Sequence, residues 1–344
     1  MTDAAEDFLD VEILLRRYAL VGGPPEMVPL LERVAEVCAA NPAVADLARQ
    51  QSAEIFEGLP VPTTDSLKKW TMPEWELGEA LGAYCMALAL SGVPKIAATH
   101  RKFGFGEEQL AKTYSWFRAM IGVYARRHGG VPGVEHTRLF WFRNHADGVL
   151  FRFGNMEFLR GPVPDYVPRE LKASLGPDDE VPTFHFPGGE GGLDRERMRA
   201  SFAEAMAFWK RVFGHYPKAW ACDSWLFNPV WRKLIPNSRI ARVIDNFEFV
   251  GTLPHNPKEP SGLYYVYGND TCDPRDCPAE NSLERASARS IAAERTWLKA
   301  VLSSAAMIPD MFSSISLHRV SGCRSADRQA GCPAMCGCDK IPAS

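Results

Sequence analysis

The sequence lacks the features that mark membrane, secreted and nucleic-acid-binding proteins. No run of apolar residues reaches the roughly 18 that a bilayer-spanning helix needs. The first ten residues, MTDAAEDFLD, are acidic, whereas a signal peptide begins with basic residues. The formal net charge is -3 and the pI is about 6.3, so the chain has no general attraction for nucleic acid or an anionic membrane. We therefore expect a cytoplasmic protein with neither nucleic acid nor membrane as a partner.

The nine cysteines do not suggest a disulfide framework, because their number is odd and no secretion signal accompanies them. Cys38, Cys85 and Cys222 lie in apolar periodic segments and are expected to be reduced core residues. Four others crowd the last part of the chain: Cys323, Cys332, Cys336 and Cys338. Their irregular spacing fits no zinc motif. We expect a loosely ordered tail at 303–344 and no metal site, with a metal-binding tail as the alternative.

Residues 1–146 have the pattern of packed helices. Apolar residues recur at steps of three and four through 26–38 and 106–127, which predicts helices with one buried face. Residues 74–91 are long and apolar, and their small residues permit close helix packing. The segment RKFGFG at 101–106 resembles an Arg-x-x-Gly-x-Gly loop, but its helical surroundings favour a corner between two helices.

After GGVPG at 129–133 the pattern changes to short β-rich runs separated by helices. GVLFRFGNMEFLR at 148–160 predicts a hairpin that turns at Gly154–Asn155. PTFHF at 182–186 predicts a strand, and 194–213 predicts a helix that Asp194 caps. The remaining predicted elements are the strand KAWACDSW, the short helix NPVWRKLI, the strands RVIDNFEFVG and GLYYVYG, and a last helix at 281–301. The second half is therefore a mixed sheet with helices packed on it.

The loop PGGEGGL, residues 187–193, joins the strand PTFHF to the helix at 194–213. Glycines allow backbone N–H groups to approach an anion closely, and the helix N-terminus adds unpaired donors and partial positive charge. The loop has neither the Gly-Lys-Ser/Thr of a P-loop nor the βαβ series of a dinucleotide-binding fold. By local pattern alone it is more typical of a flexible turn than of a ligand-binding loop.

Four blocks of the sequence resemble a bacterial family of GNAT-like acyltransferases: FRFGNMEF, FHFPGGEGGLDRERMRASFAEAMAFWKRVFG, ACDSWLFNPVWRKLIPNSRI and SLERASARSI. That family has a helical N-terminal domain followed by a GNAT-like C-terminal domain, and the resemblance extends over roughly residues 10 to 295. It implies an α+β fold, with a helical domain at 1–146 and a GNAT-like mixed β-sheet flanked by helices at 147–302. The chain departs from the pattern at Phe186, where Arg or Gln is usual, at Asp223 and at Arg239.

The resemblance also implies a site for acyl-CoA, most simply acetyl-CoA, as co-substrate. The loop would hold the CoA pyrophosphate, and the acceptor would react where the two central strands separate. The residues expected to contact CoA are Phe186, Gly188, Gly189, Gly191, Gly192, Arg195, Arg197, Trp225 and Asn228. For Arg195 and Arg197 the alternative is exposed surface charge, and Glu190 is expected to be solvated, since a carboxylate beside a pyrophosphate is unfavourable.

Acyl transfer to an amine needs a general base, and His185, Asp223 and Ser224 are the candidates. His185 points opposite Phe184 and Phe186 by strand alternation, and it is either this base or a hydrogen-bonded core histidine. Asp223 and Ser224 end a strand, and their alternative role is to cap the helix that begins at NPVW. We expect a CoA-dependent N-acyltransferase with a small-molecule or peptide amine as acceptor. The alternative is a catalytically inactive, GNAT-like protein that binds a small ligand.

Overall fold

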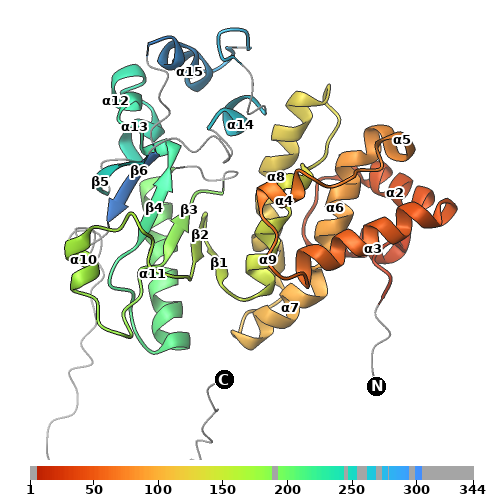
Figure 1. The fold of residues 1–344 in the computed structure, drawn as a ribbon, viewed down its shortest axis with the longest axis horizontal. Coiled ribbons are helices and arrows are strands. Elements are labelled where there is room, and N and C mark those ends of the chain that lie inside the picture. Colours follow the sequence, from red (N-terminus) through yellow and green to blue (C-terminus); the bar gives the residue numbers. More distant parts are fainter. Residues whose placement is uncertain are drawn as a thin grey trace, which may run out of the picture.

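The computed structural model describes residues 6–187, 193–243, 247–253, 262–268, 273–277, 279–293 and 299–303. Two parts pack side by side: a helical part that ends at Ala146, and a sheet flanked by helices (Figure 1). The predicted α+β architecture is confirmed. Ser303 is the last described residue, so the tail from 304 onward and the glycines of the 188–192 loop lie outside the described residues.

The helical part forms where apolar residues repeat at helical spacing and where caps satisfy the first N–H groups. Asp10 accepts hydrogen bonds from the backbone N–H groups of Glu12 and Ile13, and Asn41 caps the third helix in the same way. The elements are α1 (Val11–Leu20), η1 (Pro25–Met27), α2 (Val28–Ala40), α3 (Pro42–Phe56), α4 (Thr64–Leu67), α5 (Glu74–Leu77), η2 (Gly78–Ala80), α6 (Leu81–Ser91), α7 (Val93–Lys102), α8 (Glu108–Arg127), η3 (His136–Arg138) and α9 (Phe140–Ala146). The RKFGFG segment lies at the corner between α7 and α8, as predicted.

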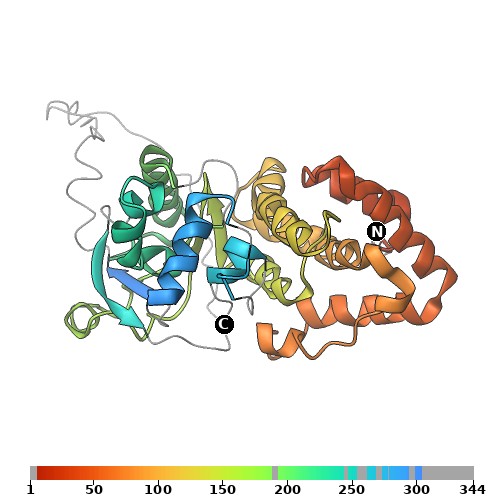
Figure 2. The ribbon, with the colours of Figure 1, turned by 90° about the horizontal axis from the view of Figure 1, so that it is seen from above.

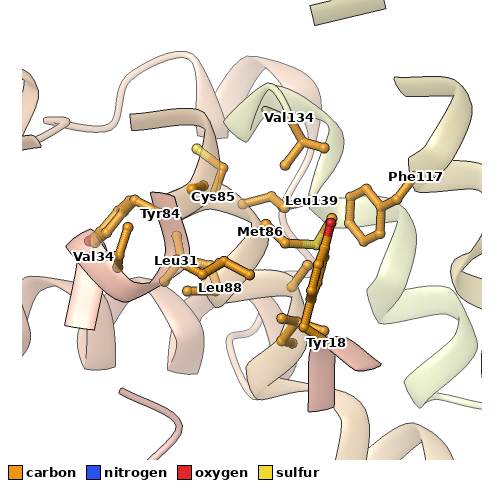
Figure 3. Packing of buried hydrophobic residues seen from close by; sticks show 14 of the residues in the cluster. Tyr18, Leu31, Val34, Tyr84, Cys85, Met86, Leu88, Phe117, Val134 and Leu139 are labelled. Carbon is orange, nitrogen blue, oxygen red and sulfur yellow. The ribbon is translucent and has the colours of Figure 1, made fainter. Parts of the chain in front are cut away.

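Helix α6 is the centre of this core, because almost every side chain along it is buried. Tyr84, Met86 and Leu88 of α6 meet Leu31 of α2 and Phe117 of α8, as Figure 3 shows. The stretch Glu74–Lys102 is long and apolar enough to cross a membrane by length and composition, which corrects the expectation that no such segment exists. However, 72% of its most apolar window is buried inside the protein, as in a core helix.

The second part is built on a six-stranded sheet with the order β1-β2-β3-β4-β6-β5. Its strands are β1 (Leu150–Phe153), β2 (Met156–Leu159), β3 (Thr183–His185), β4 (Ala221–Ser224), β5 (Glu248–Leu253) and β6 (Lys299–Ser303). Neighbouring strands are antiparallel except β3 and β4, which are parallel. The predicted hairpin is confirmed: Phe153 pairs with Met156 across the Gly154–Asn155 turn.

One face of the sheet is aromatic and packs on helix α11 (Arg195–Phe213). Phe151, Phe158 and Phe184 of the strands meet Phe202 and Phe208 of this helix with their rings edge-on or tilted. Asp194 caps α11 as predicted, by accepting from the backbone N–H of Arg197. The other helices of this part are α10 (Arg169–Ala173), η4 (Trp225–Phe227), α12 (Val230–Leu234), α13 (Arg239–Val243), α14 (Gly262–Tyr267) and α15 (Ser282–Ala293).

Two sequence-based assignments near the C-terminus were wrong. GLYYVYG was predicted to be a strand, but it forms α14, which packs on α8 of the helical part (Figure 2). Its Tyr and Val residues favour strands, and tertiary packing overrides this preference. The last helix was predicted at 281–301, but α15 ends at Ala293 and Lys299–Ser303 forms β6, which pairs with β4 and β5.

Candidate active site

The central parallel pair of the sheet opens at its C-terminal end. Thr183 of β3 pairs with Ala221 of β4, and the Ala221 N–H donates to the carbonyl of Pro182 at 3.0 Å. Among the described residues this is the last pair that joins the two strands. On its other edge β4 pairs with β6 throughout, from Ala221 with Ser303 to Ser224 with Ala300. The backbone of β3 near His185 therefore faces β4 without a ladder between them.

A row of ionisable side chains crosses the sheet at this level. Arg152 of β1 pairs with Glu157 of β2, which pairs with His185 of β3. Asp223 lies two residues after Ala221, as His185 lies two residues after Thr183, so the parallel register places these two side chains level on neighbouring strands. Alternation puts all four on the face opposite the aromatic core. Each of the four strands thus contributes one ionisable residue to the face that meets the helical part.

Glu157 is the most enclosed member of this row, with 1% of its surface exposed. Its Oε2 accepts a hydrogen bond from the indole Nε1 of Trp141 at 2.8 Å. Its Oε1 lies 3.7 Å from Nε2 of His145 and 3.6 Å from Nη1 of Arg152. Burial alone would raise the pKa of Glu157, but the neighbouring His145 and Arg152 outweigh it and hold the pKa below its ordinary value.

Residues from α8 and α9 fix the groups around this carboxylate. Nδ1 of His145 lies 2.9 Å from the carbonyl oxygen of Leu150, and since a carbonyl only accepts, this nitrogen carries the hydrogen. The buried side chain of Gln109 donates to the backbone carbonyl of Arg152 at 2.6 Å. Burial lowers the pKa of Arg152, and Glu157 opposes that shift. The helical part therefore supplies several of the polar groups that surround this row of the sheet.

His185 is half-buried at the end of β3, at the opening between β3 and β4. Its Nε2 lies 3.1 Å from the hydroxyl oxygen of Thr183, and the Trp141 ring meets its ring edge-on with centroids 4.9 Å apart. Burial lowers the pKa of His185, while Glu157 and Asp223 oppose this shift by favouring the imidazolium. A largely neutral imidazole with carboxylates beside it can accept a proton from a substrate.

The structure brings Asp223 to His185 but separates Ser224 from them. Ser224 follows Asp223 in β4, so it points to the opposite face, and its Oγ accepts from the backbone N–H of Leu226 at 3.3 Å. Ser224 therefore caps η4, whereas the alternative from the sequence was a cap for the helix that begins at NPVW, which is α12. Asn228 is 5% exposed and its Oδ1 accepts from the backbone N–H of Val230 at 3.0 Å. Catalysis by Ser224 and CoA contact by Asn228 stay predictions.

The other residues predicted to contact CoA lie in several separate parts of the fold. Phe186 packs on Phe184 and Phe227 in the aromatic layer, which confirms that it points away from His185. The Trp225 ring stacks on the Tyr265 ring, with centroids 6.4 Å apart. Arg195 and Arg197 are exposed in the first turn of α11. Four predicted contacts lie outside the described residues: Gly188, Gly189, Gly191 and Gly192.

The sequence interpretation did not include four of the residues that surround His185: Trp141, His145, Arg152 and Glu157. One signal was available, because a two-residue turn at Gly154–Asn155 places Arg152 and Glu157 opposite each other across the hairpin. No pattern in the sequence indicated that Trp141 or His145 would contact the sheet. Within the described residues no three His, Cys, Asp or Glu side chains gather as a metal site. The C-terminal cysteines lie beyond those residues.

Comparison with known proteins agrees with this geometry. Residues 150–301 match the family described as GNAT-like C-terminal domain. An acyltransferase variant in complex with octanoyl-CoA superposes with a TM-score of 0.64 and 19% identity, and covers 85% of this chain and 86% of its own. An acyltransferase in complex with decanoyl-CoA and teicoplanin gives a TM-score of 0.62 and 20% identity over the same shares. No curated protein matches the chain. Residues 150–301 therefore match the family model of GNAT-like C-terminal domains, and 85% of the chain shares the fold of these solved structures.

Proposed function

We propose that this protein is an acyl-CoA-dependent N-acyltransferase. The observation that carries the proposal is the parallel pair β3–β4, which stops at Thr183–Ala221 and opens beside His185, Glu157 and Asp223. An unpaired strand edge offers backbone donors and acceptors to an extended amide-bearing ligand such as the pantetheine arm of CoA. The exposed guanidinium groups of Arg195 and Arg197 at the start of α11 suit the CoA phosphates.

In this reaction the acceptor amine attacks the thioester carbonyl, an N–C bond forms and the C–S bond breaks. His185 takes the proton that the amine loses, and the departing thiolate gains a proton to leave as free CoA. A base whose pKa lies below the ordinary histidine value is neutral near pH 7, so it is ready to accept that proton. The carboxylate of Asp223 stabilises the imidazolium that results.

The acyl group that we propose is a medium-length chain. The structural neighbours hold octanoyl-CoA or decanoyl-CoA, and nothing in these comparisons supports acetyl in particular. Two of those structures also contain teicoplanin or its 10C derivative. We therefore propose an amine on a glycopeptide or amino-sugar compound as the first acceptor class to test.

The test is transfer from a series of acyl-CoAs, from acetyl to dodecanoyl, to a panel of such amines, followed by mass spectrometry of the product. Direct detection of the product is preferable to thiol reagents, because the protein itself has nine cysteines. We expect His185→Gln to lower kcat by about 100-fold or more, the usual share of a general base. His128→Gln alters a histidine whose side chain is 38% exposed, and should leave the rate unchanged.

Two results would contradict the proposed activity, and a third would contradict the role of His185. Failure of the wild-type protein to bind any acyl-CoA in calorimetry would exclude the co-substrate. Binding without turnover of any amine would favour the inactive, ligand-binding alternative. A His185→Gln variant as active as the wild type would show that the base is another group.

A further inference from the structure

Glu157 is a buried carboxylate for which the proposed transfer chemistry has no direct use. It is 1% exposed, and its backbone register makes it the direct cross-strand neighbour of His185. Side chains paired in this way stand about 5 Å apart at their Cβ atoms and on the same face. A charge at that distance, removed from water, acts strongly on an imidazole.

The surroundings of Glu157 hold its carboxylate in one orientation but hydrogen-bond only one of its two oxygens. The indole of Trp141 donates to Oε2 at 2.8 Å. Oε1 is buried and has no hydrogen-bond partner among the described residues; Nε2 of His145 and Nη1 of Arg152 stand 3.7 and 3.6 Å away. A buried carboxylate oxygen without a hydrogen bond lowers the stability of the fold, so Glu157 is better explained by a role at the site than by a contribution to stability.

Trp141 contacts both members of the pair. Its N–H holds Glu157, and the ring meets the His185 ring edge-on at 4.9 Å between centroids. Because Trp141 belongs to α9 of the helical part, the orientation of the imidazole depends on how that part packs on the sheet. Thr183 fixes the same ring from within β3, through the 3.1 Å contact with Nε2.

We propose that Glu157 is a positioning residue for His185: held by Trp141, it fixes the imidazole and stabilises the positive charge that His185 gains on taking the acceptor proton. This inference rests on the proposed function for its chemical meaning. It assigns the helical part a share in the active site, although no residue of that part needs to touch the reacting atoms.

The charged groups around His185 determine the direction of the expected effect. Glu157 on β2 and Asp223 on β4 face it directly, while Arg152 on β1 and His145 on α9 stand behind Glu157. Trp141 and Thr183, the other contacts, carry no charge. Burial lowers the pKa of His185 and the two carboxylates oppose that shift. Removing the charge of Glu157 must therefore lower the pKa of His185 further.

The decisive measurement is the titration of His185 in the full-length protein, followed by NMR of histidine labelled at the Cε1 carbon. The His185 signal is assigned by its loss in His185→Gln. We expect Glu157→Gln to shift the His185 midpoint to lower pH. The matched control is Glu180→Gln, because Glu180 also accepts from an indole, Trp209 Nε1 at 2.9 Å, and pairs with Arg160 at 2.6 Å. Neither a changed fold nor the loss of an indole–carboxylate bond in general explains a shift seen only at Glu157.

Kinetics give a second and separate measurement. We expect Glu157→Gln to lower kcat by about tenfold to 100-fold, with the KM for acyl-CoA within twofold of wild type, since positioning contributes part of what the base supplies. The acid limb of the pH–rate profile should move to lower pH, in step with the NMR midpoint. Trp141→Phe keeps an aromatic ring at this position and the carboxylate of Glu157 but removes the indole N–H, and should lower kcat by a smaller factor.

The outcomes separate the two proposals. An unchanged His185 midpoint in Glu157→Gln overturns the positioning role, whatever the activity. A shifted midpoint in a protein that acylates no amine supports the electrostatic coupling and counts against the proposed function instead. If Glu157→Gln does not fold, Trp141→Phe decides: a His185 titration identical to wild type overturns the proposal, and a displaced one supports it.

Discussion

Replacing Gly268 with alanine is expected to destabilise the protein by clearly more than the same change at Gly214. Both glycines have positive φ angles, +73° and +81°, which an alanine adopts at a cost of about 1 kcal/mol. They differ in what a methyl group would meet. At Gly268 the new Cβ would lie 2.7 Å from the carbonyl oxygen of Val123 in α8, whereas at Gly214 nothing lies within 4 Å.

The contact at Gly268 involves backbone, which cannot move aside cheaply. Overpacking of this kind costs about 1–3 kcal/mol, so we expect about 2–4 kcal/mol for Gly268→Ala and about 1 kcal/mol for Gly214→Ala. The difference measures how tightly α14 is held against the helical part, where the Arg138 guanidinium also stacks on the Tyr264 ring at 3.9 Å. Urea unfolding followed by circular dichroism gives both values. Equal losses in the two variants would refute the reasoning, because they would mean that α14 does not approach α8 this closely.

Two further predictions concern pH and packing. Burial lowers the pKa of His100 from its ordinary value of 6.5 to about 3. Between pH 6.5 and pH 3 the unfolded chain therefore binds a proton at His100 that the folded chain does not. The free energy of unfolding must fall as the pH drops through this window, by up to a few kcal/mol. His100→Phe is expected to flatten the pH dependence of the urea midpoint there, with His128→Phe as a surface control, and an unchanged slope would exclude His100 as its source. Leu88→Ala, at a fully buried position in α6, is expected to cost about 2–5 kcal/mol, while Leu59→Ala, at a position 84% exposed, is expected to change the unfolding free energy by less than about 0.5 kcal/mol. Similar losses in these two variants would contradict the central position of α6.

Strong local patterns gave the correct elements. The helical period of 106–127 and 194–213, the Asp194 cap and the Gly154–Asn155 turn each follow from residues close together in sequence. GLYYVYG had no such pattern, since its aromatic and branched residues suit either state, and its contact with α8 decides for a helix. The strand at 299–303 was missed because its only support is pairing with β4 and β5, which are distant in sequence.

For the site as well, features that depend on neighbouring residues were predictable and features that depend on distant pairing were not. Strand alternation correctly separated His185 from Phe184 and Phe186. The row from Arg152 to Asp223 depends on the register of four strands, and the parallel pairing of β3 with β4 leaves no mark in the local sequence. Trp141 and His145 reach Glu157 from another part of the fold, so no strand pattern could include them.

The position of β6 has a consequence for how the sheet is completed. This strand is the last described segment in sequence, yet it fills an interior place and is the neighbour that the structure records for β5. A ribosome therefore delivers β4 and β5 before the strand that must be inserted between them. Until residue 303 has emerged, the edge of β4 that later pairs with β6 is exposed and free to pair wrongly, and a chain cut before Lys299 would keep that edge exposed.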